Sequence, residues 1–75
     1  MLILDTGRYF GIHLNGVPIG DGVLYYSDGR YYNGTFENGV ENGFGKMSFS
    51  DGFEYEGYFK DGKMHGHGTL TNKSE

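Results

Sequence analysis

Short stretches of alternating residues, separated by glycines, make up most of the chain. Between residues 32 and 37, Tyr32, Gly34 and Phe36 occupy every second position, and residues 55–60 repeat this arrangement. Side chains at every second position of a β-strand lie on one face of the sheet. Both stretches are therefore predicted to be strands with one aromatic face.

A second kind of alternating stretch follows the first. Gly45, Met47 and Phe49 share one face, and residues 22–26 repeat this pattern with Gly, Leu and Tyr. Each pair of stretches is predicted to form a hairpin, closed by GVPIG (16–20), GVENG (39–43) or GKMHG (62–66). The turns between hairpins are predicted at residues 28–29 and 51–52, where Asp is followed by Gly, because glycine tolerates positive φ.

The sequence repeats itself with a period of 23 residues. This shift brings 14 of the 15 glycines into register. The aligned glycines are Gly11, Gly34 and Gly57; Gly16, Gly39 and Gly62; Gly20, Gly43 and Gly66; Gly22, Gly45 and Gly68; and Gly29 and Gly52. A fixed period in this range is typical of repeat architectures. We expect a single domain, residues 1–75, made of a partial leading unit (1–8), a weak unit (9–31), a full unit (32–54) and a terminal unit (55–75).

A lone hairpin is only marginally stable in water, so the units are expected to stack edge to edge. The predicted fold is all-β, with stacked antiparallel β-hairpins that form one elongated, twisted, solenoid-like sheet. Glycine at the second position of each aromatic face, as at Gly57, is expected to leave room for a Tyr or Phe ring to lie across the backbone.

The pattern YxGxFxxGxxxGxG, ending in SxDG, resembles the MORN (membrane occupation and recognition nexus) repeat. Residues 55–69 follow it almost throughout and residues 32–52 nearly as well, whereas residues 9–29 are a weaker copy, with His13 in place of an aromatic residue and Pro18 in the hairpin loop. The resemblance implies stacked hairpins that serve as non-catalytic scaffolding or binding modules in cytoskeletal, ciliary or membrane-associated assemblies.

The two ends depart from the repeat. Residues at the same position of successive repeats form a column of the alignment. Residues 1–5 align with a second strand, with Met1 in the column of Leu24 and Ile3 in that of Tyr26. An apolar edge strand is a template for pairing with another strand, so we expect self-association through Met1, Leu2, Ile3 and Leu4. At the other end, polar residues 72–75 are expected to cap the array. The initiating Met and this polar tail favour a complete chain over a fragment of a larger enzyme.

Composition narrows the range of partners. The chain has no Cys, which leaves neither a disulfide framework nor a thiolate metal site. Its formal net charge is −4, and Lys and Arg are scattered singly, which disfavours nucleic acid and anionic membranes as partners. With no signal-like or spanning apolar segment, we expect an intracellular, cytoplasmic protein.

Three sets of polar residues are candidates for chemistry. They are His65 and His67, which share a strand face as zinc ligands can; the Ser-Asp pairs at 27–28 and 50–51; and the carboxylates Glu54 and Glu56. No third zinc ligand is fixed beside the histidines, Ser and Asp commonly bond the backbone in turns, and the carboxylates suit a solvated face. We therefore expect no enzyme, metal site or cofactor.

Apolar residues also stand where the repeat does not require them. They are Tyr25, Tyr31, Phe44, Phe53 and Tyr58. By alternation several of them lie opposite the shared core, and an exposed aromatic surface is typical of a protein interface. We predict a non-catalytic interaction or scaffold module that docks a helix or strand of a partner protein there. The alternative is a peripheral membrane or phosphoinositide-binding module, which the family resemblance suggests and the net charge disfavours.

Overall fold

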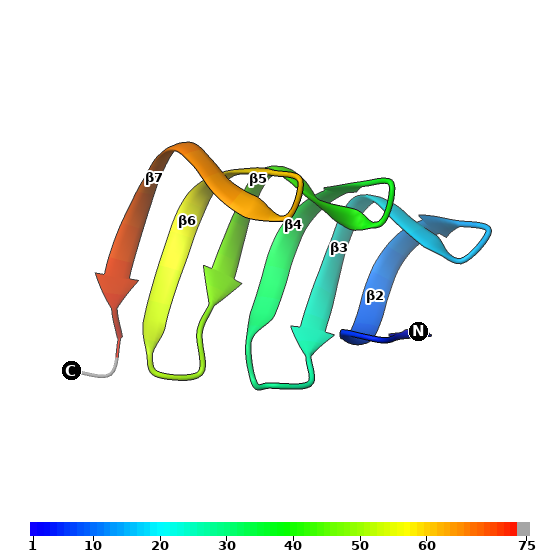
Figure 1. Ribbon diagram of the computed structural model, residues 1–75, viewed down its shortest axis with the longest axis horizontal. Helices are drawn as coiled ribbons and strands as arrows, with labels where there is room; N and C mark the ends of the chain where they lie inside the picture. Colours follow the sequence, from blue (N-terminus) through cyan, green and yellow to red (C-terminus); the bar gives the residue numbers. More distant parts are fainter. Residues whose placement is uncertain (74–75) are drawn as a thin grey trace.

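In the computed structural model, which describes residues 1–73, the chain forms one open sheet of seven antiparallel strands in sequence order (Figure 1). The strands are β1 (Leu2–Leu4), β2 (Gly7–Leu14), β3 (Val17–Tyr26), β4 (Tyr31–Glu37), β5 (Val40–Ser48), β6 (Phe53–Lys60) and β7 (Lys63–Asn72). The fold prediction is confirmed: the units are hairpins stacked edge to edge into a single sheet. The described residues contain no helix, and hence none that could cross a membrane.

The hairpins close more tightly than predicted. Each has a two-residue turn, at Asn15-Gly16, Asn38-Gly39 and Asp61-Gly62, in which both residues have positive φ. This is the pattern of a type I′ turn, whose twist matches that of the flanking strands. The prediction that the segments 16–20, 39–43 and 62–66 form the hairpin loops was wrong, because only their first glycines lie in turns and the rest begin the second strands.

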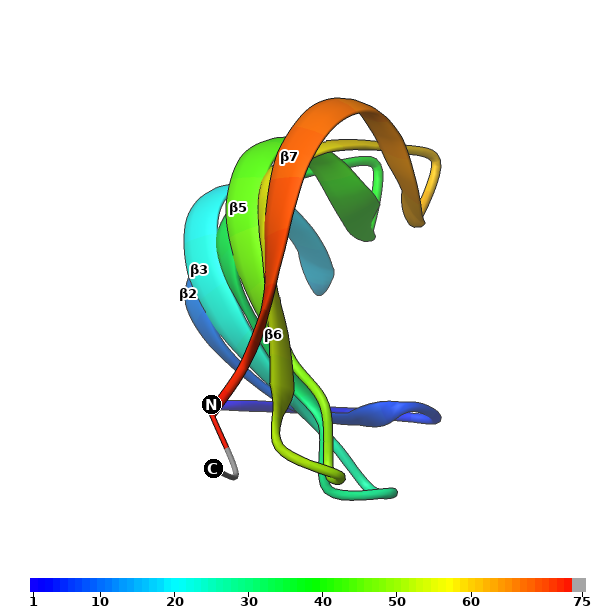
Figure 2. The same ribbon diagram turned by 90° about the vertical axis from the view of Figure 1, so that its left-hand side faces the viewer.

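A register shift interrupts every hairpin at the same level. On β2, the single residue Ile12 faces the three residues 19–21 of β3, and Gly20 lies at the centre of this bulge with φ 65°. The shift recurs opposite Thr35 and Tyr58. Bulges bend strands, and Figure 2 shows the upper part of every hairpin curling toward one side.

The core lies inside this bend, on what we call the inner face. The ring of Tyr32 packs edge-on there against Phe36 of its own unit, with centroids 5.1 Å apart, and against Phe59 of the next, at 4.8 Å. Tyr9 packs on Phe36 in the same way. Edge-to-face pairs of this kind add to the stabilisation that burial provides.

The glycines of the second strands make room for these rings. A Cβ on Gly22, Gly45 or Gly68 would collide with the ring of Tyr9, Tyr32 or Tyr55 respectively. The sequence hypothesis gave this role to the second position of the aromatic face, as at Gly57, whereas these glycines lie on the facing strand. At Gly57 a Cβ would first meet the backbone of the adjacent strand.

The tyrosine hydroxyls complete the hydrogen bonding that the bulges disrupt. The hydroxyls of Tyr9, Tyr32 and Tyr55 donate to the carbonyls of Ile12, Thr35 and Tyr58, at 2.6, 3.0 and 3.2 Å. Those three acceptors belong to the residues that the shifted ladder skips. The same tyrosine therefore fills the bend and satisfies a carbonyl that the bend would leave without a ladder partner.

The leading strand has the opposite face buried from the one predicted. Leu2 and Leu4 pack against the core, whereas Met1 and Ile3 are 70% and 69% exposed. Leu2 pairs with Tyr9 and takes the role of Leu24, but the connection to the tyrosine is one residue shorter than in the other units. Because side chains alternate between faces, a one-residue difference reverses the face that each residue occupies.

The predicted polar cap is only partly within view. Asn72 ends β7, and the backbone N–H of Lys73 donates to the carbonyl of Gly52 at 2.7 Å. The other two residues of the cap, Ser74 and Glu75, lie outside the described residues.

Candidate interaction surface

The face opposite the core, the outer face, is not covered by a second layer. The shortest dimension of the backbone is 15 Å, against 40 Å along the array. Two aromatic clusters lie on this face, one on each half of the sheet.

The first outer cluster lies over β2, β3 and β4. Phe10 and Tyr25 pack edge-on with ring centroids 5.7 Å apart, and Tyr25 lies 5.8 Å from Tyr31. Phe10 is 46% and Tyr25 50% exposed. The structure thus brings two of the predicted site residues, Tyr25 and Tyr31, together on one surface.

The second outer cluster lies over β5 and β6. Phe44 and Tyr58 are cross-strand partners whose rings pack edge-on at 5.4 Å, and each is about half exposed. Together with Glu56, His67 and Thr69 they line a shallow hollow. Two further predicted site residues are therefore paired, beside a carboxylate and an imidazole.

A polar strip runs beside the two clusters. Asn33, Lys46 and Glu56 are consecutive cross-strand neighbours on the outer face. The Lys46 ammonium lies 3.5 Å from a carboxylate oxygen of Glu54, and the Lys73 ammonium lies 3.6 Å from the same oxygen. The charges on this strip are mixed in sign, so the outer face is not a basic surface.

Phe53 does not belong to either outer cluster. It shares the inner face with Tyr55 and lines an apolar groove on the last unit. The other apolar residues of that groove are Phe49, Met64 and Leu70. Phe53 is thus the member of the predicted set that alternation puts on the inner face, because it lies an even number of positions from Tyr55.

Sequence reasoning missed Phe10 and the groove residues Met64 and Leu70. Phe10 could have been found, because Asn33 and Glu56 occupy its column and the repeat does not demand an aromatic residue there. Leu70 follows the repeat pattern, whereas the position of Met64 holds Pro18 and Glu41 in the other units, and what distinguishes both is their exposure, 60% and 54%. That exposure depends on whether another unit follows, and the sequence of a single repeat does not encode this.

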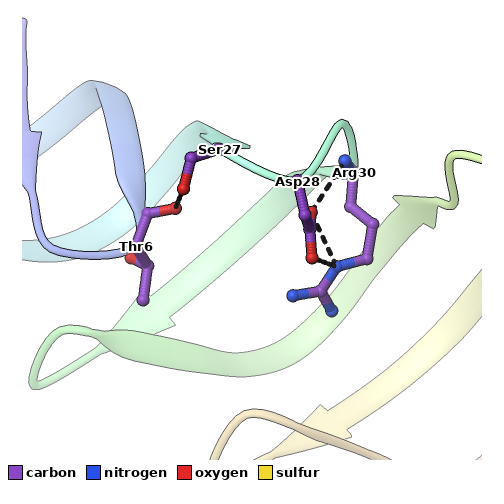
Figure 3. Close-up of polar contacts among 4 residues, drawn as sticks. All are labelled: Thr6, Ser27, Asp28 and Arg30. Atoms are coloured by element: carbon purple, nitrogen blue, oxygen red, sulfur yellow. Dashed lines mark hydrogen bonds and ion pairs between the residues drawn. The ribbon is translucent and has the colours of Figure 1, made fainter.

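The Ser-Asp pairs are turn residues. The Ser27 hydroxyl donates to the Thr6 carbonyl at 3.3 Å, and Asp28 accepts from the backbone N–H of Arg30 at 3.1 Å and from its guanidinium at 2.9 Å (Figure 3). The Arg30 N–H, with the guanidinium beside it, lowers the pKa of the Asp28 carboxyl. Arg30 also stacks over the Tyr26 ring, 4.2 Å from its centroid. These contacts build the turn between units, and no base lies beside Ser27 in the described part of the chain.

The histidines lie on the exposed strand β7, and the described residues contain no group of three or more potential ligands that could hold a metal ion. Glu54 is held by two lysines, as described above. None of these residues forms a nucleophile–base or metal-ligand constellation within residues 1–73.

One buried charge was not anticipated. Glu41, predicted to be in a loop, is only 6% exposed, and its Oε2 has no hydrogen-bond partner among the described residues. Burial raises the pKa of its carboxyl. Pro18 and Met64 hold the same position in the other units, so the fold does not need an acid there.

Comparison with known families supports the sequence interpretation. The family model of the MORN repeat matches residues 32–53 and 55–74. The comparison with curated proteins gave no match. The matched segments are the two units whose tyrosines, glycines and phenylalanines build the inner face, and the resemblance stated from the sequence is thereby confirmed.

Proposed function

Because the chain belongs to the MORN repeat family, whose repeats are generally non-catalytic protein or membrane interaction modules, we propose that it is a protein-binding module. Its outer face docks a segment of a partner protein. The two outer aromatic clusters are the anchoring points.

The observation that carries this proposal is aromatic exposure where the fold needs no aromatic residue. The column of Tyr58 holds Ile12 and Thr35 in the other units, and that of Phe44 holds Asp21 and His67. The sheet therefore forms with residues other than Tyr and Phe at these positions. Half-exposed Tyr and Phe rings at positions where the repeat does not require an aromatic residue are typical of interaction surfaces.

The polar strip indicates the kind of segment that fits. A partner segment that contacts both clusters passes over the polar strip, where Lys46 and Glu56 are cross-strand neighbours of opposite charge. An amphipathic helix or strand can satisfy both parts, with apolar residues over the rings and polar residues over the strip.

A membrane surface is the other class of partner known for such modules, and the charges count against it. Ten Asp and Glu residues outnumber six Lys and Arg residues, and the lysine on the outer strip is already paired with an acid. Flotation with anionic liposomes at moderate salt discriminates between the classes, because attraction to such vesicles needs clustered basic residues.

The experiment that tests the proposal is selection of binding peptides from a random display library on the full chain. The selected peptides are then titrated against a Phe44→Asp/Tyr58→Thr variant, which carries the residues found at the same positions in the preceding unit. We expect about 2 kcal/mol of binding free energy to be lost for each anchoring ring.

A matched control keeps this test specific. Leu14→Lys removes an exposed apolar side chain at the hairpin tip, where Glu37 and Lys60 stand in the other units, and should leave peptide affinity unchanged. Equal affinity for the double variant and the wild type, or recovery of the chain with liposomes but with no peptide, would contradict the proposal.

The proposal extends to location. As a scaffold of this family, the protein is expected in the cytoplasm, at cytoskeletal or ciliary structures. Imaging of a fluorescently tagged chain checks this, and a uniformly secreted or nuclear signal would contradict it.

A further inference from the structure

The two ends of the sheet carry complementary halves of one contact. Within residues 1–73, no strand pairs with the free edge of β7, and β1 covers only the base of β2, from Gly7 to Tyr9 (Figure 1). The edge of β2 from Phe10 onward is open on that side. A second strand of one hairpin is thus exposed at one end, and most of a first strand at the other.

Inside the chain, the same two kinds of strand meet twice in one register. In the contact of β3 with β4, Gly22 faces Gly34 and Leu24 faces Tyr32. The contact of β5 with β6 repeats it, with Gly45 facing Gly57. We infer that β7 of one copy pairs antiparallel with β2 of a second copy in this register, so that the chain assembles head to tail.

The side chains at the two ends match the internal contact. In that register Gly68 faces Gly11 of the second copy, and Leu70 faces its Tyr9, as Leu24 faces Tyr32. The glycine columns then continue across the junction, so that the bends of both copies coincide. A two-fold pairing of β7 with β7 would place the bent arm of one copy beside the straight base of the other.

The groove on the last unit lies beside Tyr55, whose ring, within residues 1–73, lacks the contact that a following unit gives to Tyr9 and Tyr32. Tyr9 and Tyr32 each pack against a phenylalanine of the following unit, whereas the ring contact of Tyr55 is with Phe59 of its own unit. Head-to-tail pairing brings His13 of the second copy, which stands in the phenylalanine column, over Tyr55. The exposed Met64 and Leu70 would be covered together with it.

The hairpin turns supply a second, independent match. Gly39 donates its N–H to the Pro18 carbonyl, and Gly62 donates to the Glu41 carbonyl, both at 3.0 Å. In each case the turn of one unit rests on the unit before it. A Cβ on Gly16, in the first turn, would meet nothing within 4 Å, and the Met64 carbonyl is the corresponding acceptor on β7. The first turn thus lacks a preceding unit to rest on, and β7 presents the carbonyl that such a turn would bond.

Strand β1 acts as a removable plug in this account. It occupies the edge of β2 that β7 of the second copy would use, with Leu2 in the place of Leu70. It is three residues long, against the ten of β7, and every further strand residue adds pairing that the plug does not provide. The contact is heterologous, so assembly proceeds as an open chain unless its geometry closes a ring.

Disulfide trapping tests the pairing and its register, because the native chain has no cysteine. The full chain is made as two single variants, Arg8→Cys and Thr71→Cys, one of them isotopically labelled. Both residues are exposed and lie on strands at opposite ends of the sheet, and the proposed register places them directly opposite each other between copies. After oxidation of the mixture, mass spectrometry resolves the mixed dimer from the two homodimers.

We expect the mixed dimer to exceed either homodimer by about tenfold, because pairing raises the effective concentration of the two thiols. Thr69→Cys with Arg8→Cys, two residues out of register, should give a smaller excess. In the full chain, Leu2→Ser/Leu4→Ser should increase trapping by loosening the plug, and Leu70→Glu should abolish it.

Three results would overturn the proposal. A statistical mixture of dimers would mean random collision, and a dominant Thr71→Cys homodimer would mean two-fold pairing of β7. Reduced trapping when β1 is weakened would mean that Met1 to Leu4 is itself the pairing strand. The outer-face variants Phe44→Asp/Tyr58→Thr should leave trapping unchanged, so this interface and the peptide-binding surface succeed or fail separately.

Discussion

Strands β5 and β7 are the second strands of successive units and yet differ greatly in burial. Met47 on β5 is 4% exposed, whereas Leu70, at the same position on β7, is 60% exposed. Glu41, a charged residue, is buried, while Met64 in its column is 54% exposed. Burial in this sheet is therefore set by whether another unit follows, more than by the hydrophobicity of the strand itself.

The tyrosines of the two units show the same dependence. Tyr32 is completely buried between Phe36 and Phe59, and Tyr55, with one such ring, keeps 8% of its surface exposed. Each unit contributes half of a ring stack and leaves the other half to its neighbour. This nearest-neighbour logic is that of repeat proteins in general.

The largest expected effect is at the glycine beneath the central tyrosine. Gly45→Ala would drive a methyl group into the Tyr32 ring, which is held on both sides, and should destabilise the fold by about 3 kcal/mol. Gly68→Ala makes the same collision with Tyr55, whose ring packs against one phenylalanine instead of two, and should cost clearly less. Urea unfolding of both variants measures the difference, and equal losses would contradict the comparison.

The next effect is expected for the paired aliphatic residues. Met47→Ala empties a buried site and should cost about 2 to 3 kcal/mol. Leu70→Ala, at the equivalent exposed position, should stay within about 0.5 kcal/mol. Thermal melts at low protein concentration give both values. A large loss for Leu70→Ala at every concentration would show that β7 is covered within a single copy.

Glu41→Met should stabilise the protein by about 1 kcal/mol at neutral pH, because it replaces a buried carboxylate, whose Oε2 has no hydrogen-bond partner within residues 1–73, with the residue found in the next unit. Burial raises the folded-state pKa of Glu41, so the wild type should gain stability as the pH falls through that raised pKa and lose it again as the pH rises.

The pH dependence supplies the control for this variant. Unfolding free energies measured from neutral pH toward the ordinary glutamate range should show a smaller rise for Glu41→Met than for the wild type. Identical slopes for the two proteins would mean that Glu41 is solvated in the folded state.

The smallest effect is expected from removing one tyrosine hydroxyl. Tyr32→Phe deletes the donor to the Thr35 carbonyl and should cost about 1 kcal/mol. Tyr55→Phe should cost less, because the bonds from its hydroxyl, at 3.2 and 3.4 Å, are longer and its surroundings are more exposed. Chemical denaturation measures both losses of stability. A larger loss for Tyr55→Phe than for Tyr32→Phe would contradict the comparison of the two units.

Much of the fold was predictable because the period of 23 residues and the alternation act together. The aligned glycines define the units, and the positions of Tyr32, Gly34 and Phe36 define the buried face. The location of the hairpin turns was less accessible: Asn38-Gly39 is a recognised turn signal, but Gly43, a bulge glycine inside the strand, looks the same in the sequence as a loop glycine.

The candidate surface was predicted in part for a related reason. Alternation predicted that several of the five residues lie opposite the core, and Tyr25, Tyr31, Phe44 and Tyr58 do so. Phe53 lies on the inner face, because it is an even number of positions from Tyr55. The burial of Glu41 depends on the Gly62 turn of the following unit, which lies over it, and no local pattern reveals such a contact.

Native-state hydrogen exchange tests most directly the central claim that each unit is completed by the next. The amides of β5 that bond to β4 should exchange at least about a hundredfold more slowly than those of β7 that bond to β6, measured at a dilution where the protein is monomeric. Equal protection of the two strands at that dilution would contradict the account, because it would mean that the last unit is as complete by itself as the one before it.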